Sequence, residues 1–259
     1  MTGDAAELLA QLPVWAFGFV LLLARAGSAC MLLPGIGEVE LPTTIRAGFA
    51  ITLTVVLLPV IAPLIPPAPA DVWRCVAMVA AEVVTGLWLG WLTRLMLMAM
   101  PIAGQIISSV MGQTNVLQPD PALGPQTAVL SSLLSQTATV LVLATGLHAM
   151  PFLALAGSYN LIPPGTLLPA ADTAAQVTHA LAEAFALALR LAAPFVLAGL
   201  VWQTGLGVLS RLVPQLHVFF AAMPGEILMG ILLLGLLSTT LLTVWQDHVQ
   251  ASFAALPGM

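Results

Sequence analysis

Six long apolar segments dominate this 259-residue chain and decide what it can fold into. They are Leu12–Leu33, Thr44–Ile65, Val72–Met111, Thr127–Tyr159, Ala174–Ser210 and Gln215–Trp245. A membrane-spanning helix needs about 20 predominantly apolar residues. Charged residues make up only 7% of the chain, whereas a soluble domain carries about a quarter. The sequence therefore predicts an all-α integral membrane protein, with one helical membrane domain over residues 1–259.

Several of these segments are unsuited to a straight, simple span. Val72–Met111 offers 40 residues, about twice the length that a span needs. Prolines interrupt the apolar runs at Met100-Pro101, Ala193-Pro194 and Met223-Pro224. An interior proline removes a backbone hydrogen bond and kinks a helix. Because hydrocarbon cannot satisfy the freed carbonyl, we expect about six kinked or broken helices whose breaks face protein or water.

Composition excludes several classes of function. The chain has six arginines and no lysine against eleven acidic residues, for a net charge of −5. No basic run could neutralise a phosphate backbone, so we expect no nucleic-acid partner. The four histidines and two cysteines are too widely spaced for a metal motif. No nucleophile–base pair or phosphate-binding loop is present in the sequence, so we predict neither an enzyme nor a cofactor.

Charged residues inside the apolar segments are the first functional candidates, because an unpaired charge in a membrane costs several kcal/mol. They are Arg25, Glu82, Arg94, Glu183, Arg190 and Glu226. We expect them to pair with charges on partner subunits or to reach the helix ends, in preference to forming an ion or proton pathway. Glu183 and Arg190 lie two turns apart on one helical face and could share a network. Gly86 and Gly90 form a GxxxG pattern that favours close helix–helix contact.

A series of short motifs runs in order along nearly the whole chain. They are Arg25 … Leu33-Pro34-Gly35-Ile36-Gly37 … Leu41-Pro42 … Ile45-Arg46, then Gly112 … Asp120-Pro121, Gly146-Leu147-His148, Ser158-Tyr159 … Pro163-Pro164-Gly165, and finally Ala193-Pro194 … Gly205-Leu206-Gly207 … Arg211 … Pro214-Gln215 … Pro224. Their ordered combination resembles the FliR family of flagellar biosynthesis proteins and its injectisome counterpart, the SctT family. Gly146-Leu147-His148 and Ser158-Tyr159 favour the flagellar branch.

The resemblance implies a non-enzymatic, structural and gating subunit of the type III export gate. Such a subunit joins FliP-like and FliQ-like membrane subunits in a helical complex, contacts a FlhB-like protein, and helps to carry unfolded flagellar proteins across the bacterial inner membrane at the flagellar basal body. It also implies structural roles for the motif residues Arg25, Pro34, Gly37, Pro42, Arg46, Asp120, Pro121, Gly207, Arg211, Pro214, Gln215 and Pro224. Other readings are an injectisome subunit or, in another class, a small-solute or ion transporter with broken helices around a midplane site.

The polar, proline-rich stretch between the third and fourth segments takes its expected role from the same resemblance. The proposed pore plug consists of Gly112, Gln113, Thr114, Asn115, Val116, Leu117 and Gln118. Val116 and Leu117 suit a seal, and the polar members suit a wet lumen. Asp120 is expected to cap the next helix, whose start Pro121 and Pro125 set. The alternative is an ordinary solvent-exposed loop, which explains the polar residues but not the apolar ones.

Overall fold

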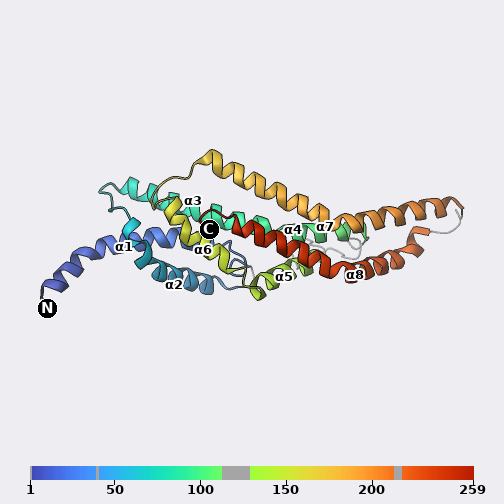
Figure 1. The fold of residues 1–259 in the computed structure, drawn as a ribbon, viewed down its shortest axis with the longest axis horizontal. Coiled ribbons are helices and arrows are strands. Elements are labelled where there is room, and N and C mark those ends of the chain that lie inside the picture. The colour runs from blue at the N-terminus through green and yellow to red at the C-terminus, as the bar shows by residue number, and fades with distance from the viewer. Residues whose placement is uncertain (1, 39–40, 113–128, 213–217) are drawn as a thin grey trace. The chain divides into compact units, whose positions relative to one another are not determined.

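The computed structural model describes residues 2–38, 41–112, 129–212 and 218–259, and every regular element in these ranges is a helix (Figure 1). The elements are α1 (Thr2–Cys30), α2 (Thr43–Ile61), the short 3₁₀ helix η1 (Ala62–Leu64), α3 (Val72–Leu97), α4 (Ala99–Val110), α5 (Val129–Ala144), α6 (Ala149–Leu161), α7 (Ala170–Leu212) and α8 (Val218–Ala254). The predicted all-α fold is therefore confirmed. The chain divides into two compact units, and each is described here by itself.

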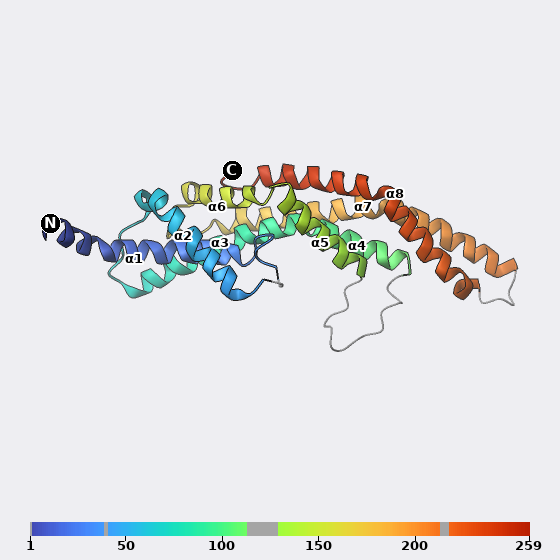
Figure 2. The same cartoon turned by 90° about the horizontal axis from the view of Figure 1, so that it is seen from below.

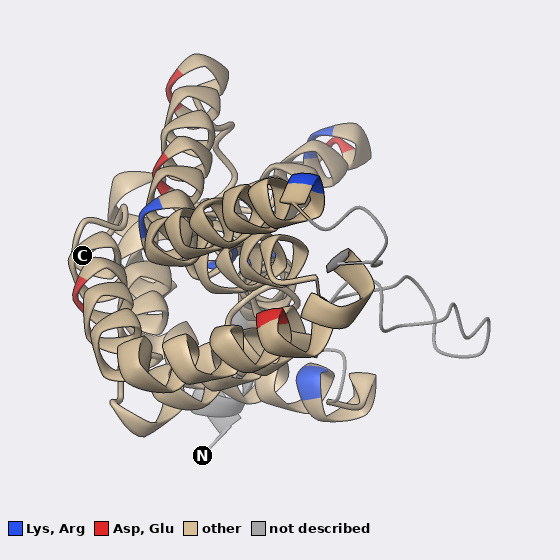
Figure 3. Cartoon of the chain, turned by 90° about the vertical axis from the view of Figure 1, so that its right-hand side faces the viewer, with Lys and Arg blue, Asp and Glu red and all other residues tan. Residues whose placement is uncertain are grey.

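Five helical stretches of the described chain are long and apolar enough to cross a membrane. They are Leu12–Cys30, Thr43–Leu64, Val72–Val110, Ala170–Leu212 and Phe219–Ala254. Helices α5 and α6 are bent by 70° at the break between them, and the number of candidate spans rises to six if this pair counts as one span. Charged residues occupy isolated positions along these helices (Figure 3). This pattern confirms the predicted multi-helix membrane protein.

The structure breaks the helix close to one of the three prolines named above and keeps it continuous at the other two. Helix α7 runs without a break through Pro194, and α8 runs through Pro224, so neither helix is broken there, and the kinks expected at these two prolines stay predictions. A helix absorbs a proline by bending locally when neighbouring groups satisfy the freed carbonyl. The third segment breaks at Met98 between α3 and α4, beside the interruption predicted at Met100-Pro101. The fourth breaks between α5 and α6, where Gly146 adopts a φ of 76°, a left-handed conformation that ends helices.

The first unit comprises residues 1–96, 142–180 and 250–259. Helices α1 and α2 lie side by side in both views (Figures 1 and 2). A core cluster of Leu22, Ile61 and Tyr159 joins α1, α2 and α6. Helix α3 also packs against α1, through contacts that define the site described below.

The second unit comprises residues 97–141 and 181–249. Its helices α4 and α5 lie alongside each other (Figure 2), and the Ser131 hydroxyl of α5 donates a 2.8 Å hydrogen bond to the Pro101 carbonyl of α4. That hydrogen bond gives the Pro101 carbonyl a partner on the neighbouring helix. The two helices are close here, since a Cβ on Gly104 would lie 2.7 Å from the Ser131 Cα. Helices α7 and α8 meet through Gln203 and Glu226. The single domain over residues 1–259 stays a prediction.

Candidate functional site

A buried ion pair between Arg25 of α1 and Glu82 of α3 is the centre of the first unit. The Arg25 Nε donates to Glu82 Oε2 at 2.7 Å, and Nη2 donates to Glu82 Oε1 at 3.0 Å. Both side chains are fully buried. The two parallel bonds form a bidentate arginine–carboxylate pair, which is both stronger and more directional than a single charged contact.

Helix α6 and the segment after it provide further partners for Arg25. Arg25 Nη1 donates to Ser158 Oγ at 3.2 Å, and Nη2 donates to the Ile162 carbonyl at 3.0 Å. The Arg25 guanidinium carbon lies 4.2 Å from the centre of the Tyr159 ring, within cation–π range. We call Arg25, Glu82, Ser158, Tyr159 and the Ile162 carbonyl, with the Gly165 amide described next, the clasp.

Gly165 supplies the last contact of the clasp because of its backbone conformation. Its amide donates a 2.6 Å hydrogen bond to Glu82 Oε1. The residue has a φ of 82°, a region that residues with a side chain rarely adopt. A Cβ at this position would also run into the Met78 side chain. The Pro163-Pro164-Gly165 motif therefore directs a backbone N–H at a buried carboxylate.

Two glycines on α3 allow the clasp to close. Glu82, Gly86 and Gly90 are four residues apart and share one helical face. A Cβ on Gly86 would collide with the Arg25 carbonyl and the Ser28 hydroxyl of α1, and a Cβ on Gly90 would lie 2.9 Å from the Ala29 carbonyl. The close helix contact predicted from the GxxxG pattern is confirmed, and its partner is α1. The same approach brings Glu82 within bonding distance of Arg25.

The clasp corrects one expectation from the sequence. We expected Arg25 and Glu82 to pair with partner subunits or to reach the helix ends, but they pair with each other inside the chain. The reason is geometric: the glycine face of α3 brings the Glu82 carboxylate against α1, within hydrogen-bond distance of Arg25. Arg94 also has internal partners, since it lies 3.8 Å from Glu38 and donates to the Gly37 carbonyl at 3.4 Å. The Glu183–Arg190 network stays a prediction.

The loop between α1 and α2 brings together further motif residues. Gly37 donates to the Leu33 carbonyl at 2.7 Å, and a Cβ on Gly37 would lie 2.6 Å from the Met31 carbonyl. Arg46 of α2 donates to the Leu41 carbonyl through Nε and Nη2, at 3.2 and 3.0 Å. Pro34 is buried, while Pro42 is exposed and precedes α2. These residues fix how the chain leaves α1 and enters α2.

A second polar contact lies in the other unit, at the residue where the predicted plug begins. Gly112 has a φ of 65°, and a Cβ there would lie 3.5 Å from the Glu226 carboxylate. Glu226 is 8% exposed and accepts a 3.1 Å hydrogen bond from Gln203 Nε2. Met111 is buried, with its sulfur against Gly230 of α8. The end of α4 is thus anchored to α8.

The structure describes only some of the remaining predicted site residues. Gly207 lies within α7 with open space around its Cβ position, exposed Arg211 lies in the last turn of α7, and Pro224 lies within α8. Gln113 to Gln118, Asp120, Pro121, Pro125, Pro214 and Gln215 lie outside the described residues. Their roles stay predictions. In the described ranges, no group of three or more His, Cys, Asp or Glu residues could hold a metal ion.

The sequence reasoning missed the clasp itself, although it named Arg25 and Glu82 separately. One signal was available. An acidic residue one turn before a GxxxG pattern lies on the face that meets another helix, so it needs a cation from that helix. Among the apolar segments before it, Arg25 was the one arginine far from a predicted helix end.

Comparisons with known proteins place this chain among bacterial secretion components. A family model described as "Bacterial export proteins, family 1" matches residues 16–252. The flagellar biosynthetic protein FliR of Caulobacter vibrioides is 31% identical over 228 residues, which cover 88% of this chain and 91% of that protein. FliR of Bacillus subtilis is 26% identical over 83% of this chain and 84% of its own length. The Yop proteins translocation protein T of Yersinia pestis is 27% identical over 80% of each.

Proposed function

Because this chain belongs to family 1 of the bacterial export proteins, we propose that it is a structural and gating subunit of the flagellar type III export gate. The family membership confirms the resemblance to FliR and its injectisome counterparts. In this role the chain carries out no chemistry. It helps to form the channel through which unfolded flagellar proteins cross the bacterial inner membrane at the basal body.

The observation that carries the proposal is the length and exposure of α7 and α8. Helix α7 has 43 residues, which corresponds to about 65 Å, roughly twice the hydrocarbon thickness of a bilayer. Large apolar side chains are exposed from Leu181, in the first third of the helix, to Leu212 at its end. In α8, only 11% of the most apolar window is buried within the chain. A bilayer cannot cover apolar surface over that length, so other apolar protein chains must cover part of it.

The partners that fit this surface are the other membrane subunits of an export gate. We propose FliP-like and FliQ-like chains along α7 and α8, and a FlhB-like chain as a further contact. Arg211 and the following Pro214-Gln215 then contribute to subunit contacts. Arg211 supports this role because it is exposed at the C-terminal turn of α7, where an arginine also interacts favourably with the helix dipole.

A gentle-detergent pull-down of the tagged full chain from its native membrane tests the assignment. We expect one copy to co-purify with several FliP-like and FliQ-like chains. Arg211→Ala should lower the yield of this complex without lowering the level of the chain, whereas Arg74→Ala, at another exposed arginine, should leave both unchanged. Recovery of the chain alone or as a homo-oligomer would contradict the proposal.

Within this function we propose that residues 112–118 act as a plug in the closed channel. The support lies at the start of the segment: Met111 is packed against α8, and Gly112 adopts a conformation that turns the chain out of α4 beside Glu226. Deleting residues 112–118 should make the assembled gate leak ions in a membrane-conductance assay while the pull-down stoichiometry stays constant. An assembled deletion variant with unchanged conductance would exclude the plug.

The injectisome remains a specific alternative, because the Yersinia pestis translocation protein T and the secretion system apparatus protein SsaT of Salmonella typhimurium also match this chain. Identification of the co-purifying substrates and subunits distinguishes the two systems. A small-solute transporter has weaker support. Glu82 is one of the charged residues in the apolar segments that could serve an ion or proton pathway, but both Glu82 oxygens accept hydrogen bonds inside the clasp.

A further inference from the structure

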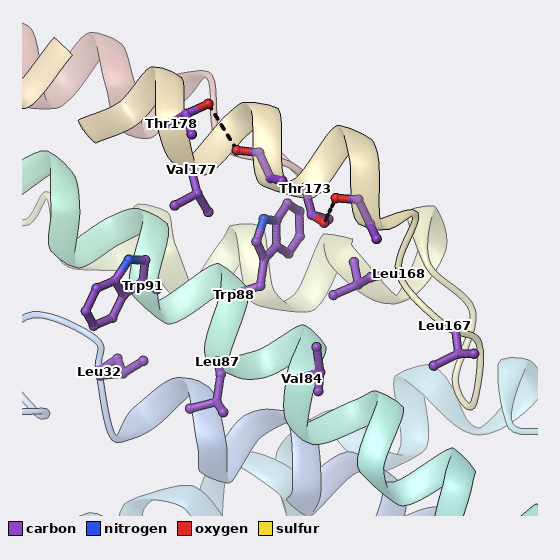
Figure 4. A pocket seen from close by; sticks show the side chains of 12 residues that line it. Leu32, Val84, Leu87, Trp88, Trp91, Leu167, Leu168, Thr173, Val177 and Thr178 are labelled. Carbon is purple, nitrogen blue, oxygen red and sulfur yellow. Dashed lines mark hydrogen bonds between the residues drawn. The ribbon is translucent and has the colours of Figure 1, made fainter. Parts of the chain in front are cut away.

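A groove of about 770 Å³ lies in the first unit, between α3 and the first turns of α7 (Figure 4). Apolar side chains line it, together with Thr173 and Thr178. None of its lining residues is charged, so the lining selects no particular occupant. The second unit holds a group that does select its neighbour, the carboxylate of Glu226.

Glu226 is a nearly buried carboxylate of α8 with a hydrogen-bond donor beside it but no cation. Its Oε1 accepts a 3.1 Å hydrogen bond from Gln203 Nε2 of α7, a neutral amide. Its Oε2 lies 3.5 Å from the Cβ position of Gly112, just after the end of α4. Glu226 is 8% exposed, whereas Glu82, which has its cation inside the chain, is fully buried. Part of the Glu226 side chain is therefore accessible from outside.

The chain's own cations do not neutralise this carboxylate. The sequence holds six arginines and no lysine, and all six arginines lie in the described ranges. The arginines that form ion pairs between described residues are Arg25 and Arg94, and both bind other carboxylates. Residues 113–128 include no arginine, lysine or histidine. Apart from His217, which lies outside the described residues, the chain thus offers Glu226 no cationic partner.

The place of Glu226 in α8 makes an unpaired charge costly. It lies about two turns inside the apolar stretch Phe219–Ala254. A charge within such a segment is unfavourable unless it is paired or reaches water. Only 11% of the most apolar window of this stretch is buried within the chain, so other molecules cover most of it. Whatever packs on α8 near Glu226 has to satisfy a carboxylate as well as an apolar surface.

We propose that a neighbouring membrane subunit packs on this part of α8 and inserts an arginine or lysine side chain that binds Glu226. The inference rests on the proposed function, because it needs an assembled complex. Charge complementarity selects the occupant. Arginine and lysine carry their charge at the end of a long apolar stem, so the charge reaches a nearly buried carboxylate while the stem stays among apolar side chains. A lipid amine would bring a phosphate with it and add a negative charge beside Glu226.

Glu226→Gln tests this ion pair, because it removes the charge and keeps an oxygen that can accept from Gln203. In the purified single chain, Tm should stay the same or rise, since no cation of the chain loses a partner. In a pull-down from the native membrane, recovery of the partner subunits should fall by about tenfold or more, because the partner's cation is left buried without an anion. A purely internal role of Glu226 would lower Tm as well.

Two control variants separate the ion pair from other effects of losing a charge. Glu82→Gln removes a carboxylate whose cation, Arg25, lies in the same chain, so it should lower the Tm of the single chain. Asp247→Asn removes the same charge from an exposed position of α8 and should leave both Tm and recovery unchanged. The predicted signature of Glu226→Gln, lost recovery at an undiminished Tm, differs from both.

The outcomes that overturn the proposal are distinct. Wild-type recovery of partners by Glu226→Gln would mean that protonation or a lipid amine neutralises the carboxylate. A single-chain Tm lower by more than about 2 °C would place the cation within the chain, with His217 as the candidate. If the wild-type chain itself recovers no partner, the export-gate proposal fails, and the ion pair fails with it.

Charge reversal identifies the partner residue. Glu226→Lys should abolish recovery of the partner subunits, because two cations then face each other in an apolar interface. An acidic substitution at one basic membrane residue of a recovered subunit should restore it. If no such reversal restores recovery, the cation does not come from a partner side chain and the proposal is wrong.

Discussion

Removing Arg25 tests the clasp most directly, because the consequence follows from its partners. In Arg25→Ala, the Glu82 carboxylate stays fully buried and keeps only the Gly165 amide as a hydrogen-bond donor among its present contacts. Breaking a buried ion pair by deleting one partner costs about 3–5 kcal/mol. Each kcal/mol shifts Tm by about 2–4 °C for chains of 150–250 residues. We therefore expect Tm to fall by roughly 6–20 °C.

The assay is thermal unfolding of the purified chain in mild detergent, followed by tryptophan fluorescence. The double variant Arg25→Met with Glu82→Leu removes both charges while keeping apolar volume, and such replacements are often neutral or stabilising. It should recover most of the lost Tm. Arg94→Ala is the control, because its pair with Glu38 is longer and partly exposed, so it contributes at most about 1 kcal/mol. An Arg25→Ala chain within about 2 °C of wild type, or a double variant as unstable as the single one, would refute the reasoning.

Three further substitutions test the backbone features around the two sites. Gly86→Ala should lower the free energy of unfolding by about 1–3 kcal/mol in the same assay, because its Cβ would meet the Arg25 carbonyl. The control is Gly48→Ala in α2, which has open space around its Cβ position and should be neutral or stabilising. Equal losses at both positions would contradict the close packing of α3 on α1. Gly165→Ala should lower stability by about 1–2 kcal/mol because of its left-handed φ, and by more because its Cβ would run into the Met78 side chain. An unchanged Tm would exclude a fixed turn at Gly165. Gly112→Ala should lower stability by about 1–2 kcal/mol through its backbone conformation alone, since its Cβ would make an ordinary 3.5 Å contact with Glu226. A rise in ion conductance of a normally assembled Gly112→Ala gate would show that this turn positions the plug. An unchanged conductance would show that it does not.

The helical membrane fold could be predicted from the sequence because apolar length is a local property. The positions of the helix breaks could not be predicted from prolines alone. A proline inside a long helix loses one hydrogen bond and can be absorbed by bending, as the continuous helices around Pro194 and Pro224 show. Gly146 instead adopts a backbone conformation that a helix cannot contain, and the chain breaks there.

The individual charged residues of the clasp could be identified from the sequence, but the contacts between them could not. Arg25 and Glu82 stand out singly as charges in apolar segments. Their pairing joins residues 57 positions apart on two helices, and only tertiary packing decides it. The role of Gly165 was hidden for another reason. A glycine after two prolines suggests a turn, but which group its amide meets depends on how α6 and α3 pack.

The two kinds of contact in this chain separate what it needs in order to fold from what it needs in order to assemble. The clasp satisfies a buried cation and a buried anion with groups from the same unit, so this packing requires no other subunit. The apolar surface of α8 has little internal cover, because only 11% of its most apolar window is buried within the chain, against 39% for α7. Substitutions in the clasp should therefore lower the amount of intact chain, whereas polar substitutions at exposed α8 positions such as Leu232 or Leu236 should lower complex yield at an unchanged Tm. If both groups of variants failed in the same way, folding and assembly would be a single step for this protein.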